Sequence, residues 1–234
     1  MIGRERVALV VPTLNEEDAI GPALARVPRD LVDRIIVADG GSRDRTAERA
    51  RQEGAEVLDA GRGYGRACLM GAERAADCGI IAYMDGDGAD PVEGIGALLE
   101  PIAAGDQDFT IASRTRGRRE PGSMSWHQVL AGRAAGFGIR ALYGVSFTDM
   151  SAFRAIRRDA LLELGMREMT YGWNLEMQMR AARSGLRILE VPLPYGRRTG
   201  GVSKVAGSLR GTLTAGSRIV RTFVEVARNA EARP

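Results

Sequence analysis

The chain has 234 residues, of which 44% are hydrophobic and 27% are charged, enough for one large α/β domain with or without a small helical appendage. Its net charge is +3, its isoelectric point is about 9.2, and nearly all its basic residues are arginine. That bias fits an anionic ligand or a membrane surface, and fits a GC-rich genome equally well. The spacing of Cys68 and Cys78 excludes a zinc site or a disulfide framework, and no apolar run is long enough for a membrane span.

Short apolar runs alternate with helical stretches as far as residue 112. The runs predict buried strands at residues 7–11, 34–38, 56–58, 80–84 and 109–112. Helices are expected between them, at residues 16–27, 44–53, 64–77 and 91–103. Asp44 is the expected N-cap of the second helix, and Pro91 the first-turn proline of the fourth. This alternation predicts a right-handed, doubly wound, mostly parallel α/β sheet.

The alternation becomes irregular after Arg114. A basic loop is expected at residues 114–122, followed by one or two helices at 124–144 and a strand at 151–156. A helix at 175–184, a strand at 187–191 and a second loop at 192–201 come next, and an amphipathic helix at 205–228 ends the pattern. We therefore divide the chain into a main α/β domain at residues 1–204 and a C-terminal amphipathic helix and tail at residues 205–234.

Polar clusters follow four of the five expected strands. They are Thr13-Leu14-Asn15-Glu16, Asp39-Gly40-Gly41-Ser42, Asp85-Gly86-Asp87 and Ser113-Arg114. The carboxyl ends of parallel strands share one edge of a sheet, and ligands of such sheets bind beyond that edge. The clusters therefore predict an active site there.

Asp85-Gly86-Asp87 places two carboxylates at the end of a buried strand, with a small residue between them. Strand alternation points both carboxylates to one face, where they can hold a hard divalent cation such as Mg²⁺ or Mn²⁺. The alternative is a polar turn, because Asp and Gly dominate turns. The neighbouring clusters favour a metal site formed by Asp85 and Asp87.

Two further segments suit a nucleotide. Asp39 can accept a hydrogen bond from a base or a ribose, although its cluster also fits a plain strand–turn–helix connection. Residues 61–66 are rich in glycine and open a helix, where backbone N–H groups attract phosphate. Their spacing matches neither a dinucleotide fingerprint nor a P-loop.

The second half of the chain adds a basic loop at residues 197–204, which either folds over phosphates or is simply solvated. His127, the only histidine, is assigned no role. Trp126 is either an interfacial anchor beside a basic patch or a cap of its helix against the core. The basic patch consists of Arg116, Arg118 and Arg119.

Together these motifs resemble the inverting family 2 glycosyltransferases of the GT-A fold, and within them the dolichyl-phosphate mannose or glucose synthase branch. The likeness rests on eight stretches in the family's order, at residues 11–17, 37–46, 63–67, 84–87, 112–114, 149–154, 171–176 and 201–204. Each stretch alone is a weak match. Eight in order, spread over nearly the whole chain, are highly specific.

The resemblance implies a function for most of these residues. The nucleotide-sugar site would consist of Pro12, Thr13, Glu16, Asp39, Gly65, Arg66, Asp85, Gly86 and Ser203. Asp85 and Asp87 would carry the metal, Mg²⁺ or Mn²⁺. Asp87 would also act in catalysis, with Arg114 and Lys204 neutralising phosphates.

The sequence departs from the family's pattern in three places. Ala89 replaces a glutamine that often follows the second Asp, so a third metal ligand is missing or is supplied by Asp90. Gly40 replaces a second Asp after Asp39. The C-terminal membrane spans of some relatives are not found, which leaves the amphipathic tail.

The reaction implied is an in-line displacement that inverts the anomeric carbon of a UDP- or GDP-linked hexose. An acceptor such as dolichyl or undecaprenyl phosphate is already anionic and needs no base. A soluble hydroxyl acceptor is the alternative, and it would need Asp149 or Glu176 to take its proton.

Two rival readings are weaker. A sugar-1-phosphate nucleotidyltransferase would carry a glycine-rich loop after the first strand, where this chain has residues 12–16. A nucleotide-sugar-binding module without catalysis fits poorly with the intact Asp85 and Asp87.

We expect a cytoplasmic enzyme with peripheral contact at the inner face of the membrane and no nucleic-acid partner. The oligomeric state is left open, a homo-oligomer included.

Overall fold

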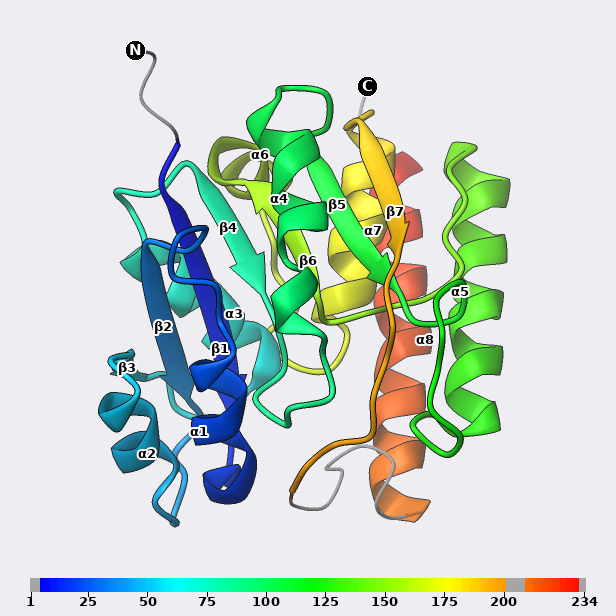
Figure 1. The fold of residues 1–234 in the computed structure, drawn as a ribbon. Helices are drawn as coiled ribbons and strands as arrows, with labels where there is room; N and C mark the ends of the chain where they lie inside the picture. Colours follow the sequence, from blue (N-terminus) through cyan, green and yellow to red (C-terminus); the bar gives the residue numbers. More distant parts are fainter. Residues whose placement is uncertain (1–4, 201–208, 232–234) are drawn as a thin grey trace.

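The computed structural model describes residues 5–200 and 209–231, in which one sheet lies between two layers of helices (Figure 1). The strands are β1 (Val7–Thr13), β2 (Arg34–Asp39), β3 (Glu56–Asp59), β4 (Ile80–Tyr83), β5 (Phe109–Ser113), β6 (Arg154–Arg157) and β7 (Ile188–Pro192). Their order is β3-β2-β1-β4-β6-β5-β7. Only β6 is antiparallel to its neighbours, β4 and β5. The expected doubly wound, mostly parallel sheet is confirmed.

Helices cover both faces of the sheet. One face carries α1 (Glu17–Ala25), α2 (Thr46–Gln52) and α4 (Gly96–Ala103), and the other carries α3 (Tyr64–Arg74), α5 (Trp126–Tyr143), α6 (Arg158–Leu164), α7 (Trp173–Arg183) and α8 (Leu209–Glu231). Successive residues of β1 alternate between the two cores: Leu9 faces the first group and Val10 the second. This alternation explains why the parallel strands are continuous apolar runs.

The helix ends differ from the expectations in small ways. Pro91 precedes a short 3₁₀ turn at Val92–Gly94, and the α-helix itself starts later, at Gly96. Arg45, not Asp44, is the N-cap of α2, although the Asp44 carboxylate accepts the Thr46 N–H at 3.0 Å. The apolar region after residue 124 is one helix, α5, which begins with a capping box. Helix α6 was not expected, because it is short and begins with charged residues directly after β6.

Helix α8 lies beside α5 and α7 (Figure 1). Gly138 of α5 allows the Phe223 ring of α8 to pack closely, because a Cβ at this position would clash with the ring. Thr222 and Val226 are buried, whereas Val220 of the same helix is 65% exposed. The proposed domain boundary at residues 204 and 205 falls outside the described residues.

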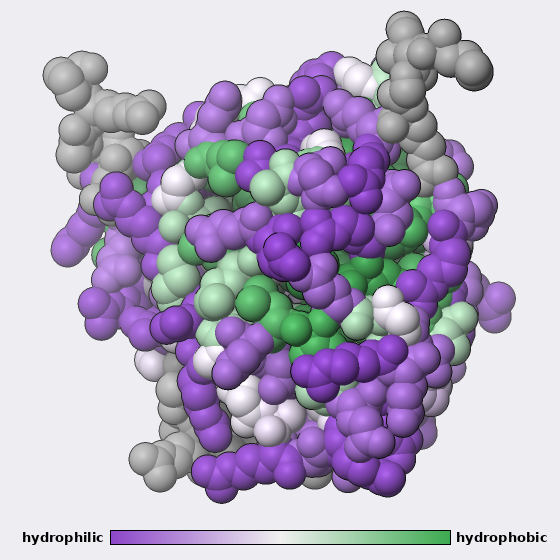
Figure 2. All heavy atoms as spheres, turned by 90° about the vertical axis from the view of Figure 1, so that its left-hand side faces the viewer, coloured by the Kyte–Doolittle hydropathy of each residue, from purple (hydrophilic) through white to green (hydrophobic). Residues whose placement is uncertain are grey.

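The surface is mostly polar on the side of β3 and α2, and many of the apolar side chains visible there lie around a central hollow (Figure 2). Helix α5, in contrast, exposes several large apolar side chains: Trp126, Leu130, Phe137 and Leu142. Within the described ranges, no helix combines the length and apolarity needed to cross a membrane.

The packing of α5 generates a stability prediction. A Cβ at Gly136 would overlap the carbonyl oxygen of Phe147, whereas a Cβ at Gly21 of α1 meets nothing within 4 Å. Gly136→Ala should therefore lower the free energy of unfolding by about 1–3 kcal/mol. The control Gly21→Ala should raise it by about 0.5–1 kcal/mol, because glycine disfavours a helix interior. Urea unfolding measures both, and equal effects would contradict the packing described here.

Candidate active site

The carboxyl ends of β1, β2 and β4 bring three of the expected clusters together. Thr13 pairs with Asp39 across the parallel ladder, and the Thr13 hydroxyl donates to Asp39 Oδ1 at 3.2 Å. Asp85 follows β4, two residues beyond its end. Gly86 lies so close to Thr13 that a Cβ would come within 2.7 Å of the threonine methyl group. Only glycine fits between the two aspartates.

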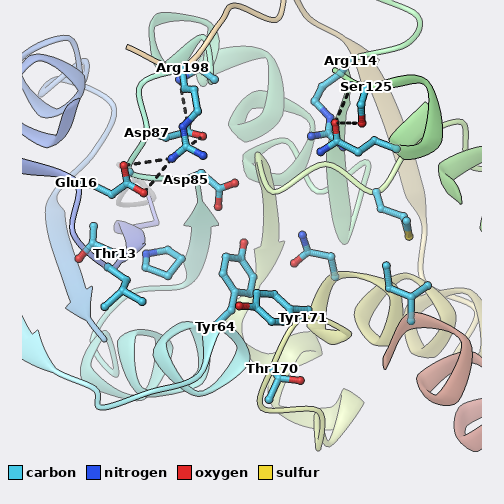
Figure 3. Close-up of a pocket in the computed structure, with 18 of the residues that line it drawn as sticks. Thr13, Glu16, Tyr64, Asp85, Asp87, Arg114, Ser125, Thr170, Tyr171 and Arg198 are labelled. Carbon is cyan, nitrogen blue, oxygen red and sulfur yellow. Dashed lines mark hydrogen bonds and ion pairs between the residues drawn. The ribbon is translucent and has the colours of Figure 1, made fainter. Parts of the chain in front are cut away.

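These strand ends open into a cleft of about 1090 Å³ (Figure 3). Seven of the expected site residues line it: Pro12, Thr13, Glu16, Asp85, Gly86, Asp87 and Arg114. The volume slightly exceeds the range of about 300–1000 Å³ that is usual for small-molecule sites. The cleft therefore lies where the sequence places the active site.

Asp39 lies just below the cleft, and the loop after β2 satisfies its carboxylate. Oδ2 accepts the N–H groups of Gly41 at 3.2 Å and Ser42 at 2.9 Å, and the Ser42 hydroxyl donates to Oδ1. Its side chain is only 8% exposed. In this structure Asp39 fixes the loop, and it does not line the cleft.

Other expected residues lie behind the cleft wall. Asp149 is 2% exposed and forms a bidentate ion pair with Arg114, at 2.6 Å and 2.7 Å. The Arg114 pKa is raised: burial opposes its charge, but the bond to Asp149 outweighs burial. Asp149 therefore holds Arg114 in place and is not open to a substrate proton.

Glu176 is also unsuited to act as a base. Its carboxylate is 2% exposed, pairs with Arg180 at 2.7 Å and accepts the N–H groups of Arg167 and Glu168. It faces a second, smaller cavity between α7 and α8. Its role in this structure is to fix the loop that precedes α7.

Residues 63–66 at the start of α3 are covered by that same loop. The Arg66 N–H donates to the Met169 carbonyl at 3.1 Å, and a Cβ on Gly65 would overlap the Glu168 carbonyl. Gly65 and Arg66 do not line the cleft, whereas Gly63 and Tyr64 do. Ser203 and Lys204 lie outside the described residues.

Arg198 is a cleft residue that the sequence analysis did not single out. Its guanidinium contacts Glu16 at 3.0 Å and lies 3.7 Å from Asp87 (Figure 3). Its loop is anchored to the Asp85–Asp87 turn, because the Thr199 N–H donates to the Asp87 carbonyl at 2.9 Å. The basic loop at residues 197–204 was the only sequence signal for this contact.

Acidic charge is concentrated at the turn after β4. Burial and the charge of Asp87 raise the pKa of Asp85 to about 6. Burial, Asp85 and Asp87 also raise the pKa of Asp90, whose Oδ2 accepts the Asp85 N–H at 2.9 Å. Arg154, fully buried and stacked 5.2 Å over the Tyr83 ring, opposes the rise at Asp85. A cation bound here would relieve the repulsion between these carboxylates.

The donor set fits a hard divalent cation that shares its coordination with a ligand. Asp85 and Asp87 offer carboxylate oxygens, and Ala89 offers none. No group of three His, Cys, Asp or Glu side chains in residues 5–200 and 209–231 is arranged as a complete metal site. Mg²⁺ is commonly bound by one or two carboxylates together with substrate phosphates, which matches this turn.

The raised pKa predicts a stability effect at Asp85. Since its folded pKa, about 6, exceeds the unfolded value of 3.8, the penalty for ionising Asp85 is present above pH 6 and disappears towards pH 4. Asp85→Asn should therefore raise the free energy of unfolding at pH 8 by about 1–3 kcal/mol without metal. Urea unfolding across this pH range measures the difference, which should shrink below pH 6. A pH-independent difference would contradict the electrostatic origin.

Comparisons with known proteins agree with this architecture. The model of the family "Glycosyl transferase family 2" matches residues 8–165. An uncharacterized glycosyltransferase of Mycobacterium tuberculosis is 36% identical over 90% of this chain and 94% of its own length. An undecaprenyl-phosphate mannosyltransferase of Micrococcus luteus is 32% identical, over 88% and 90%.

Solved structures show the same fold. A glucosyl-3-phosphoglycerate synthase of Mycobacterium tuberculosis, solved with Mn²⁺, UDP-glucose and phosphoglyceric acid, matches with a TM-score of 0.77. It is 23% identical, and the match covers 95% of this chain and 80% of the other. With the family match, the relatives and the shared fold in agreement, the chain belongs to glycosyl transferase family 2 and is a glycosyltransferase.

Proposed function

We propose that this enzyme transfers a hexose from a UDP- or GDP-linked donor to a polyprenyl phosphate, with inversion at the anomeric carbon. The observation that carries the proposal is the two-ended character of the cleft. Carboxylates and arginines of the lining come from the strand ends, whereas Ala131 of α5, Leu175 of α7 and Ile219 of α8 add apolar surface beside the polar His127, Gln128 and Asn174. An acceptor with a charged head and an apolar chain matches this division.

The donor is assigned to the carboxylate end. Pro12, Thr13 and Glu16 would surround the nucleoside, and Asp85 and Asp87 would hold a divalent cation against the diphosphate. The cation supplies positive charge to the leaving diphosphate, where negative charge develops during transfer. Arg198 lies beside the same turn and is placed to add a second positive charge. The structural neighbour solved with Mn²⁺ and UDP-glucose supports this assignment.

The acceptor is assigned to the apolar end, which contains Ala131, Met150, Leu175, Gly216 and Ile219. Arg114 lies in the same cleft, held by Asp149, and would receive the acceptor phosphate. An oxygen of that phosphate would attack the anomeric carbon as the bond to the nucleoside diphosphate breaks. The bonding electrons leave with the diphosphate. The nucleophile is already anionic, so no base is required, which agrees with the enclosed carboxylates of Asp149 and Glu176.

Peripheral contact with an anionic membrane follows from this acceptor. Helix α5 exposes Trp126, Leu130 and Phe137, and Arg116 on the loop before it is half-exposed. Each basic residue near an anionic leaflet contributes on the order of 1 kcal/mol. The name of the Micrococcus luteus relative supports a lipid-linked acceptor, whereas the phosphoglyceric acid complex of the structural neighbour keeps a soluble acceptor as the outcome to test against.

The metal assignment predicts the effect of removing one carboxylate. Asp87→Ala should abolish transfer at saturating Mn²⁺ while the far-ultraviolet circular dichroism stays unchanged, because Asp87 is a partly exposed cleft residue outside the core. Glu93→Ala, an exposed carboxylate in the same connection, is the control and should retain activity. Near-normal turnover of Asp87→Ala would refute the metal site.

The acceptor assignment predicts an effect of narrowing the apolar end. A Cβ on Gly216 meets nothing within 4 Å, so Gly216→Leu should fold normally while its side chain enters the cleft. We expect kcat/KM for a polyprenyl phosphate to fall at least roughly tenfold, about 1.4 kcal/mol, with donor hydrolysis unchanged. Val220→Leu on the same helix, outside the cleft, is the matched control.

A soluble acceptor would give the opposite pattern. If the enzyme fails to sediment with anionic liposomes and transfers faster to a glycerate or a free sugar than to any polyprenyl phosphate, the lipid acceptor is wrong.

A further inference from the structure

The smaller cavity, of about 280 Å³, is lined by α7, α8 and the loop that precedes α7. Its charged lining residues are Arg167, Arg180, Arg218, Glu168, Glu176 and Glu225. Basic and acidic side chains are equal in number, so the lining favours neither an anion nor a cation as a ligand. Thr170 lines both this cavity and the cleft. The loop before α7 therefore forms a wall that the two cavities share.

Glu168 joins that loop to α8. Its Oε1 accepts the backbone N–H of Thr170 at 2.7 Å and also the Thr170 hydroxyl. Its Oε2 accepts the hydroxyl of Thr222 at 3.2 Å and lies 3.8 Å from the Arg218 guanidinium. The Glu168 side chain is only 9% exposed, so these contacts are largely shielded from water. One oxygen thus holds the loop, and the other holds the helix.

Helix α8 and the loop also fit closely at the same place. A Cβ on Gly172 would overlap the Thr222 hydroxyl, and Thr222 is buried. Helix α8 can therefore come within reach of Glu168 only because residue 172 has no side chain. The bond between Glu168 and Thr222 depends on this close approach.

Both partners of Glu168 belong to elements that continue into the cleft. Thr170 and Tyr171 line it from the loop (Figure 3), and Gly216 and Ile219 line it from α8. Ile219 precedes Thr222 by three residues, which is less than one helical turn. A shift of α8 at Thr222 would therefore move the part of the helix that lines the cleft.

We propose that Glu168 is a positioning residue for the acceptor, because it fixes α8 against the loop before α7 and thereby sets the width of the apolar end of the cleft. Glu168 lines the smaller cavity and not the cleft, so it acts through Thr222 and Thr170 rather than on a substrate. This inference rests on the proposed function, because it assigns the acceptor to the end that α8 lines.

Steady-state kinetics test this link, with Mn²⁺, the UDP- or GDP-hexose that the wild type uses and a polyprenyl phosphate dispersed in detergent. Thr222→Val keeps the size of the side chain but removes its hydroxyl. Its KM for the acceptor should rise about three- to tenfold, the usual effect of one lost hydrogen bond. The kcat and the calorimetric Kd for the nucleotide hexose should stay unchanged, because the donor is assigned to the strand ends. Thr222→Ser keeps the hydroxyl and should behave as the wild type.

A double-mutant cycle tests whether Glu168 is the link. Thr222→Val should raise the acceptor KM of the wild type but add nothing to Glu168→Ala, in which the bond is already lost. Arg218→Gln is the milder variant: it removes only the 3.8 Å contact, leaves the buried bonds in place and should raise the acceptor KM in the same direction. It tests the link even where Glu168→Ala does not fold.

Arg221→Gln is the control on the same helix, since it breaks an exposed ion pair with Glu225 next to Thr222. All its kinetic constants should equal those of the wild type.

Four outcomes would overturn the proposal. A wild-type acceptor KM in Thr222→Val and Arg218→Gln, with only a lower melting temperature, would leave Glu168 a purely structural role and the proposed function intact. Independent effects of Glu168→Ala and Thr222→Val would show that Thr222 acts by another route. An equal loss of nucleotide-hexose affinity would show that the whole cleft is distorted. If the wild type transfers to no polyprenyl phosphate, the proposed function fails and the acceptor role of Glu168 fails with it.

Discussion

The parallel hydrogen-bond ladder of β1 with β2 and β4 determines where the polar groups of the cleft lie. In-register pairing sets Thr13 beside Asp39 and brings the turn after β4 to the same edge. Because both faces of these strands are buried, a shift of one residue would turn apolar side chains to the wrong core. The register that the core requires is therefore the register that assembles the site.

Charge balance is the second constraint on this edge. Four acidic side chains lie close together here: Glu16, Asp85, Asp87 and Asp90. Arginines from three distant segments of the chain compensate their negative charge. Arg198 reaches the acids from the loop after β7, Arg114 lies after β5, and Arg154 lies beneath them on β6. Arginine stays ionised even when buried, so it can stabilise this cluster without depending on pH. Some of the many arginines in this chain thus serve to stabilise the acidic cluster at the site.

The first half of the fold was predictable because its signals are local. Apolar runs located β1 to β5 to within two residues, and the polar residues after them identified the cleft. The strand Arg154–Arg157 was also expected, but its antiparallel direction depends on long-range packing that no periodicity reveals. Local pattern gave no sign of α6, whose seven residues are too few for a helical period to stand out.

The site was predictable only where its residues follow a strand directly. Asp85 and Asp87 satisfy that condition. Arg198 does not, because it enters the cleft from a loop far along the chain. The enclosed state of Asp149 and Glu176 was equally hidden, since a sequence shows a carboxylate but not the guanidinium beside it. For these two residues the sequence shows a carboxylate that could act as a base, but it does not show the ion pair that occupies the carboxylate.

The two tryptophans give this fold a built-in optical contrast. Trp173 is fully buried at the start of α7, whereas Trp126 is 77% exposed at the start of α5. Their intrinsic fluorescence therefore divides into a shielded component and a water-facing component that soluble quenchers reach. Because Trp126 lies between Ser125 and His127, which both line the cleft, the water-facing component reports on the start of α5 beside the cleft without any attached dye.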